Sequence, residues 1–300
     1  MLENVAQPRI SEPQCALCGS TEARLRFQDE PYSVLDCLDC GLTYVSPQLA
    51  PEALINEVYG ADYWSSENPR THGYGDYRGD QDLIRKTFER RWSALQRFFP
   101  EPGRALDVGC ATGSFLQLLR MQGWEVTGLE PSLPIALCAR EQLGAEVVLN
   151  LTLEAAKLPE KSFDIVTLWD VLEHLPDPKA ALIKVRRMLR PSGRLVIETQ
   201  NIRSLFARAL GRRWHHFKHR EHLTHFHKDT LTRVLDEAGF QLIELRSRDA
   251  GKYVRGNFIV ERSARLHRKL PAILQPLLGG DWSTYINLHD ELIVVAELRR

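Results

Sequence analysis

The sequence predicts an α/β fold in which a parallel sheet is covered by helices on both faces, preceded by a small cysteine-bearing ribbon. From residue 104 onward, short runs rich in Val, Ile and Leu alternate with segments of helical spacing. Strands joined by helices in this way build a parallel sheet that is buried on both faces. Four of the six cysteines stand among the first 40 residues as two C-x-x-C pairs. A chain of 300 residues is long enough for both parts.

The expected elements follow the chain in a regular order. We expect strands at 104–108, 125–129, 145–149, 163–168, 194–198, 240–246 and 291–297. We expect helices at 51–58, 80–99, 114–122, 132–143, 178–189 and 228–238. Asp80 and Ser132 are expected to cap their helices, and Pro191-Ser-Gly193 to form the turn before the fifth strand.

Composition and charge exclude some classes of function. The formal net charge is zero, which gives no reason at the level of the whole chain to expect a nucleic-acid partner. No apolar run reaches the roughly 18 residues that a membrane-spanning helix needs. The N-terminus lacks the basic and apolar regions of a secretion signal. We therefore expect a cytoplasmic protein.

The paired cysteines are Cys15, Cys18, Cys37 and Cys40, with eighteen residues between the two pairs. This spacing is typical of a zinc site, in which four thiolates surround one Zn²⁺. Disulfides are the alternative, and the missing secretion signal disfavours them. A ribbon this small would depend on the metal to fold. Residues 1–50 carry three basic and seven acidic residues, which argues against a grip on phosphate backbones.

We divide the chain into a zinc ribbon with a flexible N-terminus at 1–49 and a larger domain at 50–300. The segment 50–79 gathers glycines and aromatic residues that include Tyr59, Trp64 and Tyr77. A glycine-hinged aromatic loop ahead of a cofactor domain is a candidate lid. The alternative is an ordinary surface loop whose aromatic side chains pack inward.

The first strand of the larger domain ends in Asp107 and turns through Gly109 and Gly113 into a helix. The G-x-G-x-x-G motif of dehydrogenases and the Gly-Lys-Ser/Thr of the P-loop are both absent from this turn. Glu130 follows the second strand, where a carboxylate can accept from both hydroxyls of a ribose. A nucleoside ligand without a bound pyrophosphate points to S-adenosylmethionine (SAM).

Four motifs in this order resemble those of the class I SAM-dependent methyltransferases. They are the glycine turn Asp107–Gly113, with Ala111 in place of the usual middle glycine, the acidic Glu130, the fourth-strand segment 162–175 with its Leu-Glu-His, and the turn before strand five at 188–197. The resemblance covers about residues 80–300. It implies a Rossmann-like, seven-stranded methyltransferase sheet with an antiparallel last strand, and makes 250–289 an insertion before that strand.

The resemblance also implies roles for individual residues in cofactor binding. Asp107 and the backbone of 109–113 would lie beside the methionine part of SAM, Glu130 would hold the ribose, and Leu153 and Glu154 would lie near the adenine. Trp169 and Asp170 would face the reacting methyl group. The expected cofactor-binding residues are thus Asp107, Gly109, Cys110, Gly113, Glu130, Pro131, Leu153, Glu154, Trp169, Asp170 and, from the aromatic segment, Tyr77. The thiols of Cys110 and Cys138 are expected in the core.

Histidines are the candidates for a catalytic base. His174 follows Asp170 by one helical turn, and the alternative is a histidine that only bonds neighbouring backbone. Six more histidines lie in 214–227, among which His222 and His225 are the further candidates. A second metal site is conceivable there, but the spacing of these histidines matches no compact ligand pattern.

Two segments of the larger domain are basic. Residues 200–230 carry seven Lys or Arg against two acidic residues, which suits either a wall that binds an anionic acceptor or a solvated loop. Residues 252–270 suggest a basic amphipathic helix. Such a helix would contact a membrane surface through 252–278, close the acceptor site, or pack on its own domain.

The ribbon, the aromatic segment and the Glu-His-Leu-Thr-His-Phe stretch at 221–226 resemble the zinc-ribbon branch of the family. That branch is associated with methylation of sugars and small metabolites and is related to the ubiquinone O-methyltransferases. We therefore expect methyl transfer to an oxygen or carbon of a sugar, nucleotide-sugar or related anionic metabolite. The alternatives are an RNA or protein methyltransferase and a non-catalytic SAM-binding or zinc-ribbon scaffold.

Overall fold

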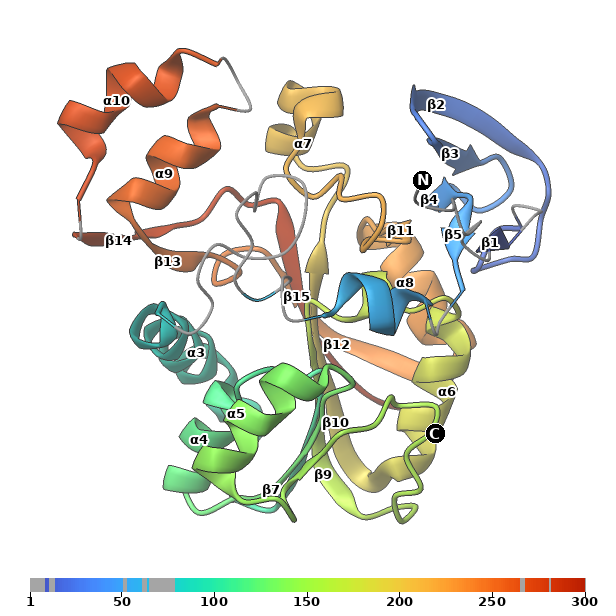
Figure 1. Ribbon diagram of the computed structural model, residues 1–300. Coiled ribbons are helices and arrows are strands. Elements are labelled where there is room, and N and C mark those ends of the chain that lie inside the picture. The colour runs from blue at the N-terminus through green and yellow to red at the C-terminus, as the bar shows by residue number, and fades with distance from the viewer. Residues whose placement is uncertain are drawn as a thin grey trace, which may run out of the picture.

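The computed structural model describes residues 9–10, 14–50, 53–60, 64, 79–264, 268–280 and 282–299. Its centre is a seven-stranded sheet with strand order β12-β15-β10-β9-β6-β7-β8 (Figure 1). The strands are β6 (Arg104–Val108), β7 (Glu125–Leu129), β8 (Val148–Leu149), β9 (Phe163–Trp169), β10 (Leu189–Gln200), β12 (Phe240–Arg246) and β15 (Glu291–Leu298). β15 runs antiparallel to both of its neighbours, β10 and β12. The expected Rossmann-like sheet with an antiparallel last strand is confirmed.

Helices cover both faces of this sheet because successive strand residues point to opposite sides. Ala105 packs with residues of α3 (Gln81–Leu95), α4 (Ser114–Met121) and α5 (Leu133–Leu143). Leu106 packs on the other face with residues of α6 (Pro178–Met188) and α8 (Lys228–Glu237). The two apolar clusters form a core on each side of the sheet.

Two of the expected strand boundaries were wrong. The third strand was expected at 145–149, but β8 comprises only Val148–Leu149. The expected turn at 191–193 lies within β10, whose pairing with β9 shifts register between Leu189 and Arg194. An irregularity of this kind keeps the strand paired on both sides of the interruption.

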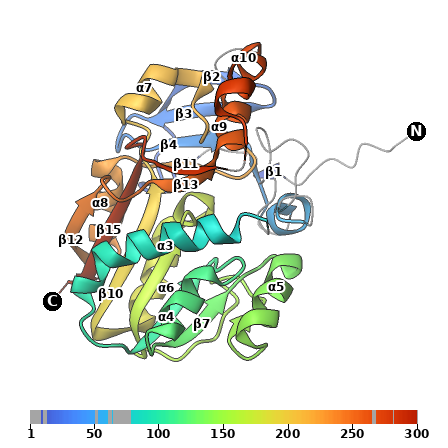
Figure 2. The ribbon, with the colours of Figure 1, turned by 90° about the vertical axis from the view of Figure 1, so that its left-hand side faces the viewer.

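The ribbon and the larger domain share a sheet. β2 (Ala23–Asp29), β3 (Tyr32–Cys37) and β4 (Thr43–Ser46) form antiparallel pairs, and β11 (Thr224–His225) pairs with β4. The ribbon therefore completes its sheet with two residues of the histidine-rich segment. In Figure 2 the ribbon strands lie with α7 (Leu205–Leu210), α9 (Gly256–Ser263) and α10 (Leu270–Leu278) at one end of the molecule, and α4 and α5 lie at the other end.

The segment between β12 and β15 forms a hairpin that carries two helices. Its elements are β13 (Lys252–Arg255), α9 (Gly256–Ser263), α10 (Leu270–Leu278) and β14 (Ser283–Ile286). A single basic helix over 252–270 was therefore a wrong expectation, because 252–255 is a strand. Arg255 fastens the hairpin to the start of α3, donating to Asp80 Oδ1 at 2.8 Å and Asp82 Oδ1 at 3.0 Å.

Asp80 is consequently not the side-chain cap that we expected for α3, because its carboxylate accepts from Arg255 and makes no capping hydrogen bond.

The helix α10 exposes Ile273 and Leu277, which are 60% and 74% accessible to solvent. Within the described part of the chain, no helix is both long enough and apolar enough to cross a membrane.

Candidate active site

The glycine turn after β6 has the backbone geometry that its sequence demands. Gly109 and Gly113 have φ angles of 73° and 78°, in the left-handed region that glycine adopts without strain. Ala111 also has a positive φ of 48°, although it has a Cβ atom. Its N–H donates to Glu130 Oε2 at 3.0 Å, and the N–H of Gly109 donates to Leu129 O at 2.8 Å. These bonds fasten the turn to the end of β7.

Two buried carboxyl groups flank this turn. Asp107 accepts a hydrogen bond from Thr167 Oγ1 at 2.6 Å, and Glu130 accepts from the N–H groups of Ala111 and Ser132 at 3.0 and 2.8 Å. Burial raises the pKa of each carboxyl to about 7. Each oxygen of Glu130 keeps a further lone pair, so the carboxylate has room to accept two ribose hydroxyls. The residues present therefore fit a nucleoside.

The expected adenine side lies after β7 and β8. Asn150 Nδ2 donates to the carbonyls of Glu130 and Pro131 at 2.8 and 2.9 Å and so joins the two loops. Leu153 is buried, whereas Glu154 is exposed and its backbone carbonyl accepts a hydrogen bond from Lys184 Nζ. Sequence reasoning missed Asn150, which follows the third strand much as Glu130 follows the second.

Cys110 and Tyr77 complete the expected cofactor set. The thiol of Cys110 is buried in the core, and a Cβ at Gly128 would lie 2.6 Å from its sulfur. Only the backbone of Cys110 thus belongs to the turn. Tyr77 lies outside the described residues.

Asp170 stands where β9 ends, directly after the buried Trp169. Its φ angle of 52° is unusual for a residue with a side chain. Burial and the Glu291 carboxylate raise the pKa of Asp170 to about 6, while Arg91 opposes that rise. Among the described residues its Oδ1 atom has no hydrogen-bond partner. Asp170 therefore offers an acceptor atom at the edge of the sheet where open α/β folds bind their ligands.

Further buried charges lie at the same edge, and sequence reasoning missed them. Arg91 of α3 lies 2.6 Å from Glu198 Oε1 and 4.0 Å from Glu291 Oε2. Glu173 is fully buried and accepts from Thr199 Oγ1 at 2.8 Å. Burial raises the pKa of Glu173 and Glu198 well above the ordinary value. Arg91 and Glu198 carried no sequence signal, because each is a single charge within an apolar pattern, whereas Glu173 was marked only as part of the Leu-Glu-His motif.

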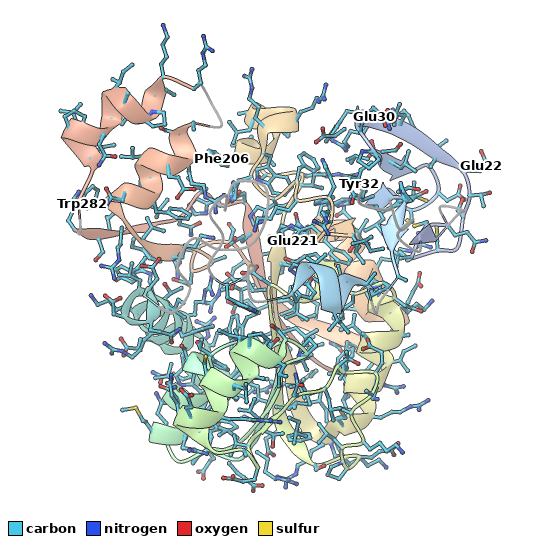
Figure 3. All side chains as sticks on the ribbon, viewed as in Figure 1. Glu22, Glu30, Tyr32, Phe206, Glu221 and Trp282 are labelled. Atoms are coloured by element: carbon cyan, nitrogen blue, oxygen red, sulfur yellow. The ribbon has the colours of Figure 1, made fainter. Side chains whose placement is uncertain are left out.

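His174 ends the helical turn Leu172–His174, four residues after Asp170. Its Nδ1 atom lies 2.9 Å from the carbonyl oxygen of Glu221 and 2.7 Å from Tyr59 Oη. A carbonyl only accepts, so a hydrogen bond from His174 to the Glu221 carbonyl requires the tautomer with its proton on Nδ1, which leaves Nε2 unprotonated. Burial lowers the pKa of His174. Figure 3 shows Glu221 near the middle of the molecule, between the ribbon and the β13–β14 hairpin.

His222 and His225 are joined through the side chain of Gln200. Gln200 Nε2 donates to Thr224 O at 3.2 Å and to His222 Nδ1 at 3.3 Å, and Gln200 Oε1 accepts from His225 Nδ1 at 2.7 Å. Burial lowers the pKa of both histidines well below the ordinary value. The rings of His174 and His222 lie 4.8 Å apart. The structure thus brings the three candidate bases into one buried network.

The basic residues of 200–230 do not form a buried wall. Lys218 is largely buried and pairs with Glu221 Oε2 at 3.2 Å. Five of the seven basic residues are exposed, namely Arg203, Arg208, Arg212, Arg213 and Lys228. This placement favours the solvated loop over an anion-binding wall.

The described part of the aromatic segment touches both sides of the site. Tyr59 reaches His174, and Ser132 Oγ donates to the carbonyl of Tyr59 at 2.7 Å. Trp64 Nε1 donates to the same hydroxyl at 2.8 Å. The Ser132 hydroxyl is therefore engaged by this segment, and its expected capping of α5 was wrong because it makes no capping hydrogen bond.

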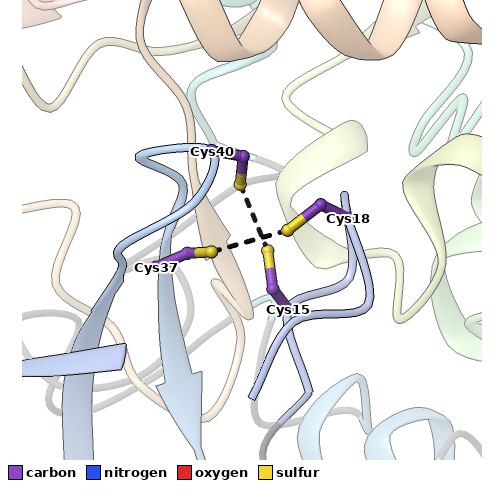
Figure 4. Close-up of side chains that lie close together, drawn as sticks. All are labelled: Cys15, Cys18, Cys37 and Cys40. Atoms are coloured by element: carbon purple, nitrogen blue, oxygen red, sulfur yellow. Dashed lines mark hydrogen bonds between the residues drawn. The ribbon is translucent and has the colours of Figure 1, made fainter. Parts of the chain in front are cut away.

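The four ribbon cysteines converge in space, as Figure 4 shows. The sulfurs of Cys15 and Cys40 lie 3.4 Å apart, those of Cys18 and Cys37 lie 3.5 Å apart, and all four lie within 4.8 Å of one another. None of these thiols is in a disulfide. The cluster can therefore hold one metal ion.

The backbone around the cysteines suits thiolates. Gly19 and Gly41 have φ angles of 74° and 78°, as expected for the residue after each pair. Burial would raise the pKa of Cys37, but backbone N–H groups of Cys40 and Asp39 bring it to about 7. Burial raises the pKa of Cys15 to about 11. N–H donors directed at sulfur favour the charged form that a metal binds.

Comparison with known proteins agrees with this geometry. The model of a methyltransferase domain matches residues 81–245, which is more than half of the chain. The ubiquinone biosynthesis O-methyltransferase of Cereibacter sphaeroides is 33% identical over 168 residues, covering 53% of this chain and 67% of that protein. The corresponding enzyme of Photobacterium profundum is 33% identical over 103 residues, covering 33% of this chain and 44% of its own length. The chain thus spans less than half of the latter relative.

Solved structures share the fold at low identity. The 1,6-didemethyltoxoflavin-N1-methyltransferase of Burkholderia thailandensis is 18% identical, with 93% of this chain and all of that chain covered and a TM-score of 0.51. A SAM-dependent methyltransferase from Archaeoglobus fulgidus is 21% identical, with 79% of this chain and all of that chain covered and a TM-score of 0.50. With the matched domain and the order of its motifs and strands, the chain belongs to the class I SAM-dependent methyltransferase family.

Proposed function

We propose that this protein transfers a methyl group from SAM to an oxygen, or to a carbon, of a small polar molecule such as a sugar, a nucleotide-sugar or a related anionic metabolite. The observation that carries the proposal is the contact of the partly buried His174 with the Glu221 carbonyl, because the tautomer that donates Nδ1–H to this carbonyl leaves Nε2 as a base. Its neighbours Asp170 and His222 line the same edge of the sheet. The names of the curated relatives, which are O-methyltransferases of ubiquinone biosynthesis, agree with an oxygen acceptor.

Different residues bind the methyl donor and remove the proton of the acceptor. SAM supplies a methyl group that its sulfonium already activates, so positioning accounts for much of the catalysis. Asp107, Glu130 and the glycine turn hold the donor, and we assign the removal of the acceptor proton to His174 Nε2. The carboxylates of Glu221 and Asp170 favour the imidazolium that this transfer creates. Because Nδ1 keeps its proton on a carbonyl, the ring holds its orientation throughout the step.

We propose that the four ribbon cysteines bind one structural Zn²⁺. Ligand sulfurs at about 2.3 Å from a tetrahedral ion are about 3.8 Å apart, close to the spacing of these sulfurs. We assign the ribbon to 1–49 and the methyltransferase domain to 50–300. Such an ion would stabilise the ribbon where it packs on the methyltransferase domain. Since β4 pairs with β11, the ribbon would support the segment that carries His222 and His225.

We further propose that the segment 50–79 acts as a lid over both substrates. The contacts of Tyr59 with His174 and of Trp64 with Ser132 support this assignment, because they join the segment to both sides of the site.

The test is methyl transfer from SAM that carries an isotopic label in its methyl group. The full-length protein is incubated with nucleotide-sugars, quinol precursors and RNA, and the products are analysed by mass spectrometry. Label on an oxygen or carbon of a small molecule is the expected result. Label on RNA, or on protein, would replace the proposal with the polymer-modifying alternative. Binding of SAM without transfer to any acceptor would favour a non-catalytic scaffold.

A further inference from the structure

A second cluster of metal-ligating side chains lies apart from the ribbon cysteines. His215 and His216 come from the histidine-rich segment, and Asp290 directly precedes β15. His215 Nε2 and His216 Nε2 lie 3.7 and 3.8 Å from Asp290 Oδ2, and one ligand atom of each residue lies within 4.8 Å of the others. We propose that these three residues bind a divalent transition-metal cation.

The donor set has the right chemistry for such an ion. Imidazole nitrogens together with a carboxylate oxygen are ligands that zinc, cobalt and iron accept, and two histidines with one carboxylate leave positions open for further ligands. Ligand atoms at about 2.1 Å from a tetrahedral ion are about 3.4 Å apart. The distances from the two histidines to Asp290, 3.7 and 3.8 Å, are therefore a few tenths of an ångström longer than in a closed site.

The surroundings orient the ligands. Trp214 Nε1 donates to Asp290 Oδ2 at 2.8 Å, a second-sphere bond that fixes the carboxylate. Glu291 Oε1 lies 3.3 Å from His216 Nε2 and could supply a fourth ligand after a small rotation. His216, Asp290 and Glu291 are each less than a tenth exposed. A bound dication would neutralise two carboxylates that the fold buries side by side.

The position of this site would allow the ion to bind the methyl acceptor. The rings of His216 and His222 are 5.7 Å apart, and Glu291 pairs in register with Gln200, which holds His222. An acceptor oxygen bound to the ion would lie beside the candidate bases, and the ion would favour loss of its proton. This second step rests on the proposed function, whereas metal binding does not.

Cobalt substitution tests the site without an activity measurement. The full-length protein is freed of metal under reducing conditions and titrated with Co²⁺ while its absorption spectrum is recorded. We expect two ions per chain, one with strong thiolate-to-cobalt charge-transfer bands and one with weaker ligand-field bands from nitrogen and oxygen ligands. His215→Gln and Asp290→Asn should each weaken the second ion at least tenfold and leave the charge-transfer bands unchanged.

His219→Gln is the matched control, because His219 belongs to the same segment but pairs with Asp29 of the ribbon. This variant should bind both ions as the wild type does. A wild-type protein that takes up only the thiolate-bound ion would overturn the proposal, as would variants at 215 and 290 that keep the second ion. In that case the histidines act only as partners of the two carboxylates. Calorimetry with SAM, run on the same samples, separates this result from a failure of the methyltransferase assignment.

Discussion

The proposed donor side and the proposed acceptor side of the site lie at the same edge of the sheet but differ in construction. The donor side consists mainly of backbone. Positive φ angles and N–H hydrogen bonds to Glu130 and Leu129 shape the turn between Gly109 and Gly113. On the acceptor side, partly or fully buried side chains from segments far apart in the chain meet, such as Tyr59, His174 and the histidines at 222 and 225.

This difference predicts which residues of the site can be substituted without affecting SAM binding. A turn whose shape and N–H donors come from the backbone depends on few side chains, of which Glu130 is one. A pocket made of buried polar side chains depends on every partner, since each group left without one costs roughly 1–3 kcal/mol. Substitutions should therefore separate SAM binding from methyl transfer, and the predictions below test that separation.

The largest effect should come from Cys37→Ser. Loss of one thiolate removes most of the metal affinity, and structural zinc sites contribute on the order of 10 kcal/mol to folding. We expect the ribbon to unfold and methyl transfer to be lost, because β4 supports β11, while SAM binding is retained. Metal analysis, thermal unfolding and SAM calorimetry measure the three effects. Cys138→Ser, in a cysteine outside the cluster, is the control, and an unchanged metal content in Cys37→Ser would contradict the prediction.

His174→Gln should lower kcat by about 10²- to 10⁴-fold, the usual contribution of a general base. Glutamine can still bond the Glu221 carbonyl but accepts no proton, so the dissociation constant of SAM should not change. The exposed His289 provides the control variant His289→Gln. Steady-state kinetics with the acceptor found by labelling measure kcat. An equal loss of SAM affinity would show that the two sides are not separable.

The donor side was also the part that the sequence predicted well. Its elements are consecutive in the chain, so a strand, a glycine turn and an acidic residue after the next strand were enough to place Asp107, Gly113 and Glu130 at one edge. The number of strands in the sheet and its antiparallel last strand followed from the resemblance. Ala111 is a partial exception, because only the structure shows that its N–H bond to Glu130 accompanies the left-handed backbone.

The acceptor side could be predicted only in part. His174 was a candidate because it follows Asp170 by one helical turn, and His222 because it lies in the family-like stretch 221–226. Only the structure shows that their rings meet and that Gln200 contacts His222. Arg91 and Glu198 had no sequence signal, since a single charge in an apolar stripe is indistinguishable from a surface residue until the fold buries it. The pairing of β4 with β11 was equally invisible, because a two-residue strand has no periodicity.

Glu130→Gln should weaken SAM binding about 10- to 100-fold. The amide keeps the size of the side chain but loses the charge that strengthens hydrogen bonds from ribose hydroxyls and from the N–H groups of Ala111 and Ser132. Isothermal titration calorimetry measures the change, with Glu141→Gln on the exposed face of α5 as the control. Comparable SAM affinity in both variants would remove Glu130 from the cofactor site.

A change of pH should have a smaller effect on SAM affinity. Burial raises the pKa of Glu130 from 4.5 to about 7 in the SAM-free protein, so this carboxyl is mostly protonated at pH 6. Ribose recognition needs the carboxylate, and SAM affinity should fall about tenfold between pH 8 and pH 6. The stability of the SAM-free protein should change in the opposite sense. Between pH 4.5 and 7 the folded state binds more protons than the unfolded state, so stability decreases as pH rises. Calorimetry at several pH values should show a weaker dependence in Glu130→Gln.

The smallest change, Ser132→Ala, tests the link between the two sides. The substitution keeps the N–H that donates to Glu130 but removes the hydroxyl that bonds Tyr59 and Trp64. SAM affinity should therefore stay the same, whereas a lost hydrogen bond of about 1 kcal/mol should raise the opening of residues 53–60 about fivefold. Hydrogen–deuterium exchange measures this opening, with Ser93→Ala on the exposed face of α3 as the control. Because Tyr59 also contacts His174, faster exchange should be accompanied by a few-fold higher KM for the acceptor. Unchanged exchange would mean that the segment is held by its other contacts and does not report on the donor side.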